Sequence, residues 1–491
     1  MDRVLSSDVA KHAGKPVKVQ GWLHKKRLIG GINFINVRDR AGLVQVVIQD
    51  DAEVEKLRGA QVGSVLTIEG QAKEEPRAPG GAEIHEPKIT VDVEVKDEPI
   101  IEIDKPLSHK SENLDTLFDN RHIGLRSPQE QKIFKIRAAL LRNIREFLYK
   151  NDFTEIQTPK LLAGATEGGA EVFKTDYFGK EATLAQSPQL YKQMMVGAFE
   201  RVFEIAPAFR AEPSATTRHM SEVYMLDIEL GFIKDHEEVL DMVQDMTYYA
   251  ITNVYKDQAE ELKAWNAPPL TIKEKFPRYT VAQVHELYSK ATGTDTTKEK
   301  DLIPDEEKWI CDHAKKEQGC EAVFVTDFPK EAMKFYHKLA DDGQTVLWAD
   351  LLFRGLEIAT CPMRENRYEV LVEQIKSAGM DPDHPGYKYF LEAMRFGLPP
   401  HGGCGYGVDR LVEKTIGLGN VKEATLFPRD INRLTPWAKP SSKNLASSRW
   451  ISRNPFTPID ANRKNCIDSR RSLQKYTHST NRRPRASMEV N

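Results

Sequence analysis

The stretch HGGCGYGVDRLVEKTIGL (401–418) joins a glycine-rich strand directly to a helix, and it indicates what the larger part of the chain is built to hold. The alternating glycines Gly403, Gly405 and Gly407 let a planar group lie flat against the backbone. Arg410 opens the helix, from where its guanidinium can reach a phosphate attached to that group. A lone GxGxG could instead indicate a dinucleotide fold, but the fingerprint's spacing and the following βαβ unit are absent, and no GxxxxGK[ST] occurs.

Outward from this stretch, strands come in clusters separated by single helices. Apolar residues recur at helical spacing over 133–148, and Pro159 then forces Thr158 into an extended conformation. We expect strands in 171–186, 201–211, 221–232, 321–328 and 345–360, and helices near 187–200, 234–256, 364–378 and 408–418. The charged segment 257–320 is predicted to be helical, as an insertion or lid. This order favours an α+β fold with flanking helices on an antiparallel β-sheet over βαβ repeats.

The first 104 residues have a different character. Short runs rich in β-branched residues are separated by Gly or Pro turns, which predicts about five strands and a small β-barrel such as an OB-fold, although other small barrels fit nearly as well. Segment 105–130 lacks clear periodicity and is interpreted as a hinge. The main domain then occupies 131–436, and the basic tail 437–491 is expected to be disordered. A solvated extension is favoured over a nucleic-acid-binding arm for this tail.

Composition sets the cellular setting. The 491 residues are 40% apolar and 29% charged, with a formal net charge of −3, which fits a soluble globular protein of several domains. No apolar run is long enough for a membrane span, and the first residues contain no apolar signal segment. The five cysteines form no CxxC pair, which argues against a disulfide framework or a zinc site and favours a reducing cytoplasm.

The run FRAEPSATTRHM (209–220) lies between two strand-like stretches, so it is expected to form the polar tip of a long hairpin. Arg210 and Arg218 can bind phosphate oxygens bidentately and stay charged at any working pH. Glu212 could accept a hydrogen bond from an adenine amino group. A surface hairpin with ordinary solvated charges explains the run equally well when it is taken alone.

The run DLLFRGLEIATCPMR (350–364) supplies candidate metal ligands. On a strand, Glu357 is an odd number of residues from Asp350, so we expect it to point the way Gly355 does. A glutamate above a phosphate site suits Mg²⁺, which prefers one or two carboxylates together with phosphate oxygens. Each carboxylate, taken singly, is more often the partner of a salt bridge.

The three features occur in an order that resembles the class II aminoacyl-tRNA synthetases, whose three motifs match 136–159, 203–229 and 403–414. The runs QSPQLYKQ (186–193), TTRHMSE (216–222), RGLEI (354–358) and FPRDINRLTP (427–436) are similar to the aspartyl-tRNA synthetases of the archaeal and eukaryotic type. The resemblance covers residues 1 to about 436. It implies an OB-fold anticodon-binding domain, a class II catalytic domain and a homodimer formed through the first motif.

The resemblance implies a bent ATP in this cleft, with Mg²⁺ as cofactor. Arg210 would hold the α-phosphate, His219 would face the γ-phosphate, and Arg410 would bind from the other side, so Arg210 and Arg410 would be catalytic. The implied ATP-binding residues are Arg210, Ala211, Glu212, Arg218, His219, Met220, Glu357, Gly407, Val408, Asp409 and Arg410. The implied metal ligands are Glu357, Asp350 and Thr360.

The resemblance also implies L-aspartate as the amino acid. A cation at Lys192 favours a substrate carboxylate, and asparaginyl relatives usually carry an acidic residue there. The implied aspartate-binding residues are Glu167, Gln189, Lys192, Arg210, Thr360 and Arg364. Thr-Cys-Pro-Met precedes Arg364 where the family usually has a glycine pair and glutamine, and Pro362 and Cys361 are expected to stiffen and crowd that strand end near the amino-acid pocket. Lys192 alone could equally be a surface helix residue.

In the barrel, Phe34 and Gln45 match the family's stacking and edge-reading positions for anticodon bases. Phe34 could equally be a barrel-core residue. Members of the family that charge only tRNA-Asp differ from members that also charge tRNA-Asn at the positions of His24 and Pro79. The residues here look like those of the members with relaxed specificity, which charge both tRNAs. Two alternatives stay open: an asparaginyl-tRNA synthetase, and an RNA-binding paralogue without catalysis, which the altered stretch 360–363 would favour.

Overall fold

The computed structural model describes residues 1–164, 171–213 and 216–434. Residues 16–93 form a closed barrel with the strand order β1-β2-β3-β5-β4, which confirms the small β-barrel. Buried and exposed residues alternate along β1, as a strand with one face on a core requires. The barrel strands are β1 (Pro16–Arg27), β2 (Asn33–Arg38), β3 (Leu43–Ile48), β4 (Val65–Glu74) and β5 (Ala82–Val93).

The segment interpreted as a hinge contains two helices that the sequence did not reveal, α2 (Ser111–Asp119) and α3 (Arg121–Gly124). Arg121 is completely buried. Its Nη1 donates to Glu130 at 3.1 Å, and its other nitrogens donate to the carbonyls of Glu423, Thr425 and Leu426. Charge-assisted bonds of this kind anchor the second half of the segment to the main domain.

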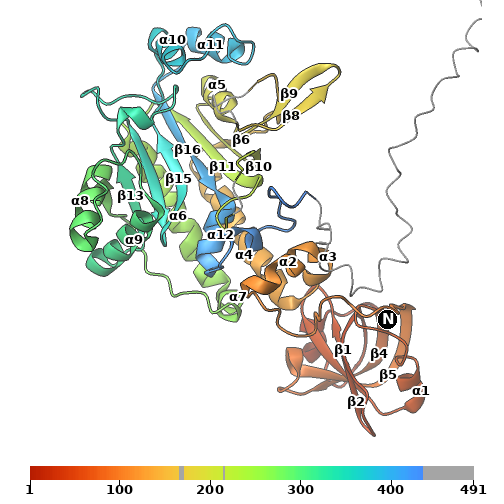
Figure 1. Ribbon diagram of the computed structural model, residues 1–491. Coiled ribbons are helices and arrows are strands. Elements are labelled where there is room, and N and C mark those ends of the chain that lie inside the picture. The colour runs from red at the N-terminus through yellow and green to blue at the C-terminus, as the bar shows by residue number, and fades with distance from the viewer. Residues whose placement is uncertain (165–170, 214–215, 435–491) are drawn as a thin grey trace, which may run out of the picture. The chain divides into compact units, whose positions relative to one another are not determined.

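The main domain is built on an eight-stranded sheet with the order β12-β13-β14-β15-β16-β11-β10-β6 (Figure 1). Only its outermost pairs, β12 with β13 and β10 with β6, are parallel, so the predicted antiparallel sheet is confirmed at the centre. The strands are β6 (Thr154–Glu155), β10 (Arg201–Phe209), β11 (Glu222–Gly231), β12 (Arg278–Thr280), β13 (Ala322–Thr326), β14 (Trp348–Phe353), β15 (Leu356–Pro362) and β16 (His401–Gly407).

Three helices share one hydrophobic core with this sheet: α4 (Pro128–Lys150), α6 (Glu237–Asp257) and α12 (Val408–Ile416). On β11, Leu226 and Ile228 belong to that core, and each such side chain stabilises the fold by about 1.5–3 kcal/mol on burial. Asp227 and Glu229 alternate with them and therefore point to the opposite face. That polar face carries the candidate site.

The prediction for 257–320 was wrong in one respect. The segment does contain α7 (Ala259–Ala264), α8 (Val281–Thr292) and α9 (Pro304–Gln318), but it also supplies the edge strand β12. A second core joins Val284 and Ile310 of α8 and α9 to Val323 and Leu352 of the sheet. The segment is therefore an integral edge of the domain.

The remaining elements surround the polar face. A three-stranded sheet is formed by β7 (Leu161–Leu162), β9 (Lys180–Leu184) and β8 (Lys174–Tyr177). The expected helix at 187–200 is α5 (Gln189–Phe199), and the one at 364–378 is α10 (Tyr368–Ser377). A further helix, α11 (Lys388–Arg395), was not predicted.

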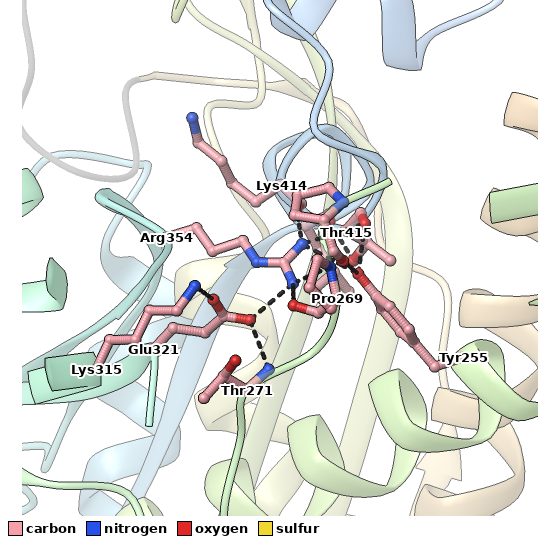
Figure 2. Close-up of polar contacts among 10 residues, drawn as sticks. Tyr255, Pro269, Thr271, Lys315, Glu321, Arg354, Lys414 and Thr415 are labelled. Carbon is pink, nitrogen blue, oxygen red and sulfur yellow. Dashed lines mark hydrogen bonds and ion pairs between the residues drawn. The ribbon is translucent and has the colours of Figure 1, made fainter. Parts of the chain in front are cut away.

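Arg354 ties several of these elements together from the tight turn between β14 and β15 (Figure 2). Arg354 and Gly355 both have positive φ, at 50° and 78°, as a two-residue hairpin turn of the type I′ class requires. The Arg354 guanidinium donates to the Lys414 carbonyl at the end of α12 (2.8 Å), to the Pro269 carbonyl (3.1 Å) and to Glu321 (2.7 Å). The Arg354 guanidinium thus joins the β14–β15 hairpin to α12 (Val408–Ile416), the helix that carries Arg410.

Candidate active site

An open cleft with an empty volume of about 1120 Å³ lies on the polar face of the sheet. The residues around it come from α5, β11, β14, β15, β16, α12 and the loops beside them. They are Ser187, Gln189, Arg210, Glu212, Arg218, His219, Met220, Val223, Tyr224, Met225, Asp227, Ala332, Lys334, Tyr336, His337, Trp348, Glu357, Ile358, Thr360, Pro362, Arg364, Gly405, Gly407, Asp409, Arg410 and Val421.

The β10–β11 hairpin brings three charged side chains to this cleft. Phe209 and Glu222 are the last paired residues, so Arg210, Glu212 and His219 lie beyond the end of the ladder. The Glu212 carboxylate is 3.9 Å from the Arg210 guanidinium and 3.8 Å from the His219 ring nitrogen. These long, partly exposed contacts are weak, and they leave the tip able to receive a charged ligand.

Glu357 and Arg410 meet at the opposite wall. Arg410 Nη1 donates to both the carbonyl and the carboxylate of Glu357, at 2.8 and 2.9 Å, and Thr360 donates to the same carboxylate at 3.0 Å. Neighbouring Arg410 lowers the pKa of Glu357 despite the cost of burial, so Glu357 is held as a carboxylate.

The strand that carries Glu357 is not regular. A register shift between Leu351 and Leu352 inserts one extra residue into β15. Such a β-bulge changes the alternation of side chains. Glu357 and Thr360 therefore reach one another although they are three residues apart.

Asp350 lies below the surface of the cleft. It pairs with Thr360 across the β14–β15 ladder and accepts a hydrogen bond from the indole of Trp348 at 2.8 Å. Burial, and then the nearby Glu357 carboxylate, raise the pKa of Asp350 well above its ordinary value. A cation beside Glu357 would relieve this repulsion.

The donor set fits Mg²⁺ that arrives with phosphate groups. Mg²⁺ keeps several waters and takes one or two protein carboxylates. Glu357, with Asp350 behind it and the Thr360 hydroxyl beside it, offers that number. Among the described residues no group of three or more His, Cys, Asp or Glu could hold a metal by itself, which agrees with an ion that needs the substrate to complete its coordination.

A network of buried charges closes the other end of the cleft. The Lys192 ammonium is 1% exposed and lies 2.9 Å from Asp227 and 3.5 Å from Glu229. The Arg364 guanidinium donates both Nε and Nη2 to Glu229, at 2.9 and 3.1 Å. Lys192 is therefore not a surface residue. Because a buried charge without a partner is costly, removing any one of these groups would destabilise the rest.

The unusual stretch before Arg364 is accommodated in two ways. Cys361 points away from the cleft into the core and lies beside Cys404 of β16. Pro362 is the last residue of β15 and forms part of the cleft wall, where it cannot donate a ladder hydrogen bond. The predicted crowding is therefore confined to Pro362.

The structure brings most of the expected ligand-binding residues together. Arg210, Glu212, Arg218, His219, Met220, Gly407, Asp409 and Arg410 border the cleft, as do Gln189, Thr360, Arg364 and Glu357. Ala211, Val408, Lys192 and Asp350 are not among the bordering residues. Asp409 accepts from the Tyr224 backbone amide at 2.8 Å and pairs with Arg137, which gives it a bracing role. Glu167 lies outside the described residues.

Sequence reasoning missed several bordering residues. Lys334, Tyr336 and His337 come from an irregular segment between β13 and β14. The run MKFYHK could have indicated them, because it clusters cationic and aromatic residues without following the pattern of a helix or a strand. Asp227 was detectable as half of an acidic pair, with Glu229, on an otherwise apolar strand.

The barrel presents its expected base-reading residues in different ways. Phe34 is half-buried, so it is not a barrel-core residue. Gln45 donates to Glu83 at 2.7 Å, and Glu83 also contacts His85 at 2.9 Å. His24, by contrast, is only 5% exposed. Pro79 begins a short 3₁₀ turn (Pro79–Gly81) and is half-buried.

Comparison with known proteins identifies the family. Residues 113–431 match the family described as tRNA synthetases class II (D, K and N), and residues 17–92 match the OB-fold nucleic acid binding domain. The chain belongs to the class II aminoacyl-tRNA synthetases. The predicted OB-fold and class II catalytic domain are thereby confirmed.

Relatives of this synthetase match it over nearly their whole length. An aspartate–tRNA(Asp) ligase of Pyrococcus furiosus is 41% identical over 86% of this chain and 97% of its own. An aspartate–tRNA(Asp/Asn) ligase of Thermus thermophilus is 39% identical over 88% of this chain and 100% of its own. The crystal structure of asparaginyl-tRNA synthetase from Pyrococcus horikoshii with asparaginyl-adenylate superposes with a TM-score of 0.81 at 32% identity, covering 89% of this chain and 100% of that one.

Within the described part of the synthetase, the helices are all too short or too polar to span a bilayer.

The raised pKa of Asp350 predicts a pH-dependent effect on stability. An unfolded aspartate titrates near about 3.9, so above that pH and below the folded pKa the folded chain holds a proton that the unfolded chain has lost. The free energy of unfolding therefore falls as pH rises through this window. Asp350→Asn removes the effect and keeps an acceptor for Trp348.

We expect Asp350→Asn to melt at a higher temperature than the wild type near neutral pH in magnesium-free buffer. The difference should shrink as pH approaches about 4, where Asp350 is protonated in both states. Thermal melts followed by circular dichroism across this range measure it, with the exposed Asp305→Asn as control. A lower melting temperature at neutral pH, or a difference that does not vary with pH, would contradict the assignment.

Proposed function

We propose that this synthetase activates L-aspartate with ATP and transfers the aspartyl group to the 3′ end of tRNA-Asp. The observation that carries the proposal is the convergence of Arg210 and Arg410 on one cleft from opposite walls, with Glu357 between them and Lys192 and Arg364 at its end. The ligase names of its 41% and 39% identical relatives support the same reaction.

The first step needs no general base. An oxygen of the aspartate α-carboxylate attacks the α-phosphorus of ATP, a new P–O bond forms, and the bond to the β-phosphate breaks to release pyrophosphate. Catalysis then consists of positioning and charge neutralisation. Arg210 holds the α-phosphate, and Arg410 binds the folded polyphosphate from the other wall. Because both are guanidiniums, they stay charged throughout.

Arg218, His219 and Met220 complete the nucleotide site on the hairpin, where Glu212 and Ala211 face the adenine. Gly407 lets the base lie flat on β16, since the three nearest atoms that a Cβ there would meet all belong to the Arg410 side chain. Glu357, Asp350 and Thr360 would hold Mg²⁺, which would neutralise phosphate charge. ATP is the nucleotide and Mg²⁺ the cofactor in this proposal.

Selection of aspartate depends on the buried charges. Lys192 and Arg364 are the two cations at that end of the cleft, and Asp227 and Glu229 balance their charge and hold both in place. A side-chain carboxylate can accept from such cations with both of its oxygens, whereas an amide offers them only one acceptor oxygen. Gln189 and Thr360 lie beside the amino acid. Glu167, outside the described residues, would bind its ammonium group.

The second step transfers the aspartyl group from the adenylate to the terminal ribose of tRNA, and AMP leaves. The OB-fold barrel binds the anticodon, with Phe34 stacking on a base and Gln45 reading an edge. Glu83 orients the Gln45 amide. His24 and Pro79 lie in the region that sets the choice between tRNA-Asp and tRNA-Asn, and the burial of His24 means that it acts on the shape of the surface and not by direct base contact.

Pyrophosphate exchange tests the proposed activation. We expect exchange of labelled pyrophosphate into ATP that depends on aspartate, and a fall of roughly 10²–10³-fold in rate for Arg410→Met, since a positioned charge donor is removed. Exchange that depends on asparagine would establish the asparaginyl alternative. The complete absence of exchange would support an RNA-binding paralogue without catalysis.

Charging of purified tRNAs tests the second substrate. We expect the synthetase to aspartylate tRNA-Asp and, with lower efficiency, tRNA-Asn, because His24 and Pro79 resemble the relaxed kind. Aspartyl-tRNA formed on each tRNA at equal concentration gives the measurement. Complete refusal of tRNA-Asn would rule out relaxed specificity and leave the activation step untouched.

We infer that the synthetase works as a homodimer. The short strand β6 ends the main sheet, and α4 precedes it, so this edge offers unpaired backbone groups to a second copy. Tyr149 of α4 is 54% exposed at this edge and donates to Glu155 of β6 at 2.6 Å. Sedimentation velocity at micromolar concentration should give twice the chain mass of 55.8 kDa, and a monomer would contradict the inference.

The cytoplasm is the compartment that suits this function. Cys311, Cys320, Cys361 and Cys404 are all free thiols, as expected in a reducing environment. The fifth cysteine, Cys466, lies outside the described residues. Cell fractionation that recovered the protein outside the cytosol would argue against this placement.

A further inference from the structure

Helix α9, in the segment expected to be an insertion or lid, reaches the nucleotide side of the cleft through one residue. Glu307 accepts a hydrogen bond from Arg218 Nη2 at 3.1 Å. The Glu307 side chain is 16% exposed and that of Arg218 is 29% exposed, so the pair is only partly screened by water. The same Nη2 donates to the Gly355 carbonyl at 3.1 Å, which fixes the guanidinium from two directions.

Arg218 belongs to the tip of the β10–β11 hairpin, whereas Glu307 lies on α9 and Gly355 lies in the turn between β14 and β15. The Glu307 carboxylate and the Gly355 carbonyl are therefore two acceptors that join this tip to elements far away in the sequence.

The position of Glu307 is set by rigid packing. A Cβ atom added to Gly355 would lie 3.0 Å from the Lys308 Cα, so α9 approaches the β14–β15 turn as closely as the backbone permits. Ile310, Cys311 and Ala314 of the same helix are buried against Val323 and Leu352. At the base of this region, Glu321 binds both Arg354 and Lys315 (Figure 2). Helix α9 therefore cannot shift without disturbing the sheet edge.

We propose that Glu307 is a positioning residue, which holds Arg218 extended into the cleft so that its guanidinium meets the β- and γ-phosphates of a nucleoside triphosphate. This deepens the proposed function and depends on it for the identity of the ligand. Arg218 is an arginine with four rotatable bonds, and fixing such a side chain in advance removes an ordering cost from ligand binding. Glu307 itself does not touch the nucleotide.

Another interpretation of the same contact gives the opposite effect. If Glu307 were only a resting partner that the phosphates must displace, its loss would strengthen the binding of triphosphate. If the pair were an ordinary surface ion pair, its loss would change nothing measurable. The second contact of Arg218 Nη2, with the Gly355 carbonyl, favours positioning. A guanidinium that is bound to backbone on one side stays in place when the ligand arrives.

The test compares two nucleotides on Glu307→Gln. The amide has the same shape but no charge, so its bond to Arg218 is weaker than that of the carboxylate. Binding of ATP with Mg²⁺ and of AMP is measured by isothermal titration calorimetry on the full chain. AMP lacks the β- and γ-phosphates. We expect ATP to bind about three- to tenfold more weakly, as loss of one preorganised side chain implies, with AMP binding unchanged.

Asp305→Asn is the matched control, because it makes the same change on an exposed residue in the same turn of α9. It should leave both affinities at the wild-type value. In pyrophosphate exchange, Glu307→Gln should raise the KM for ATP and leave the KM for aspartate unchanged. A purely structural role would not separate the two substrates.

Three results would overturn the proposal: unchanged ATP affinity, stronger ATP binding, or equal loss of ATP and AMP binding, which would indicate a general defect of the site. Failure of this proposal about Glu307 can be distinguished from failure of the proposed function. A wild-type chain that bound ATP but showed no aspartate-dependent exchange would refute the ligase activity, while the comparison of ATP with AMP on Glu307→Gln would still decide the role of Glu307.

Discussion

The ion pair between Arg410 and Glu357 is the interaction on which the arrangement of this cleft depends. The Arg410 guanidinium and the Glu357 carboxylate are 2.9 Å apart, and their contact joins the first turn of α12 to β15. The pair lies across the two strands that form the floor of the site. With both side chains partly exposed, the pair adds little to the stability of the fold. Its importance is geometric, because it sets the distance between the Arg410 guanidinium and the Glu357 carboxylate, the groups proposed to bind phosphate and metal. Arg354 fixes the opposite end of α12 to the turn that precedes Glu357, so strand and helix are joined at both ends.

The charged groups at the other end of the cleft also fix one another's positions. They are more deeply buried than Arg410 and Glu357, so their burial costs more free energy. Glu229 is completely buried and is matched by Arg364 and Lys192, which keeps its pKa below the ordinary value despite burial. The network is satisfied before any substrate binds, so the cations are oriented in advance. Substrate binding at this end would then require little reorganisation of side chains, which is the condition for strong electrostatic discrimination in a site partly shielded from water.

The family, the layer order and most cleft residues could be predicted from the sequence because they follow from local patterns. Gly407 ends β16 and Arg410 lies in the first turn of the helix that follows, and Arg210 and Arg218 share one hairpin tip. The contact between Thr360 and Glu357 could not be predicted, because a single-residue bulge changes the alternation of side chains between them. The edge strand β12 is only three residues long, too short for any period to appear. Glu307 and Lys334 reach the cleft through tertiary packing from segments that carry no motif.

The altered stretch 360–363 shows how a departure from a family pattern can be absorbed. Cys361, the residue after Thr360, points its side chain into the hydrophobic core. It makes apolar contacts there and leaves the surface of the cleft unchanged. Proline is tolerated in a sheet only where the ladder ends, and Pro362 is the terminal residue of β15. Arg364, two residues later, keeps its bidentate contact with Glu229. The change therefore stiffens the wall between the metal-binding and amino-acid ends while the charged groups on both sides retain their positions, which is why the stretch does not by itself argue for loss of activity.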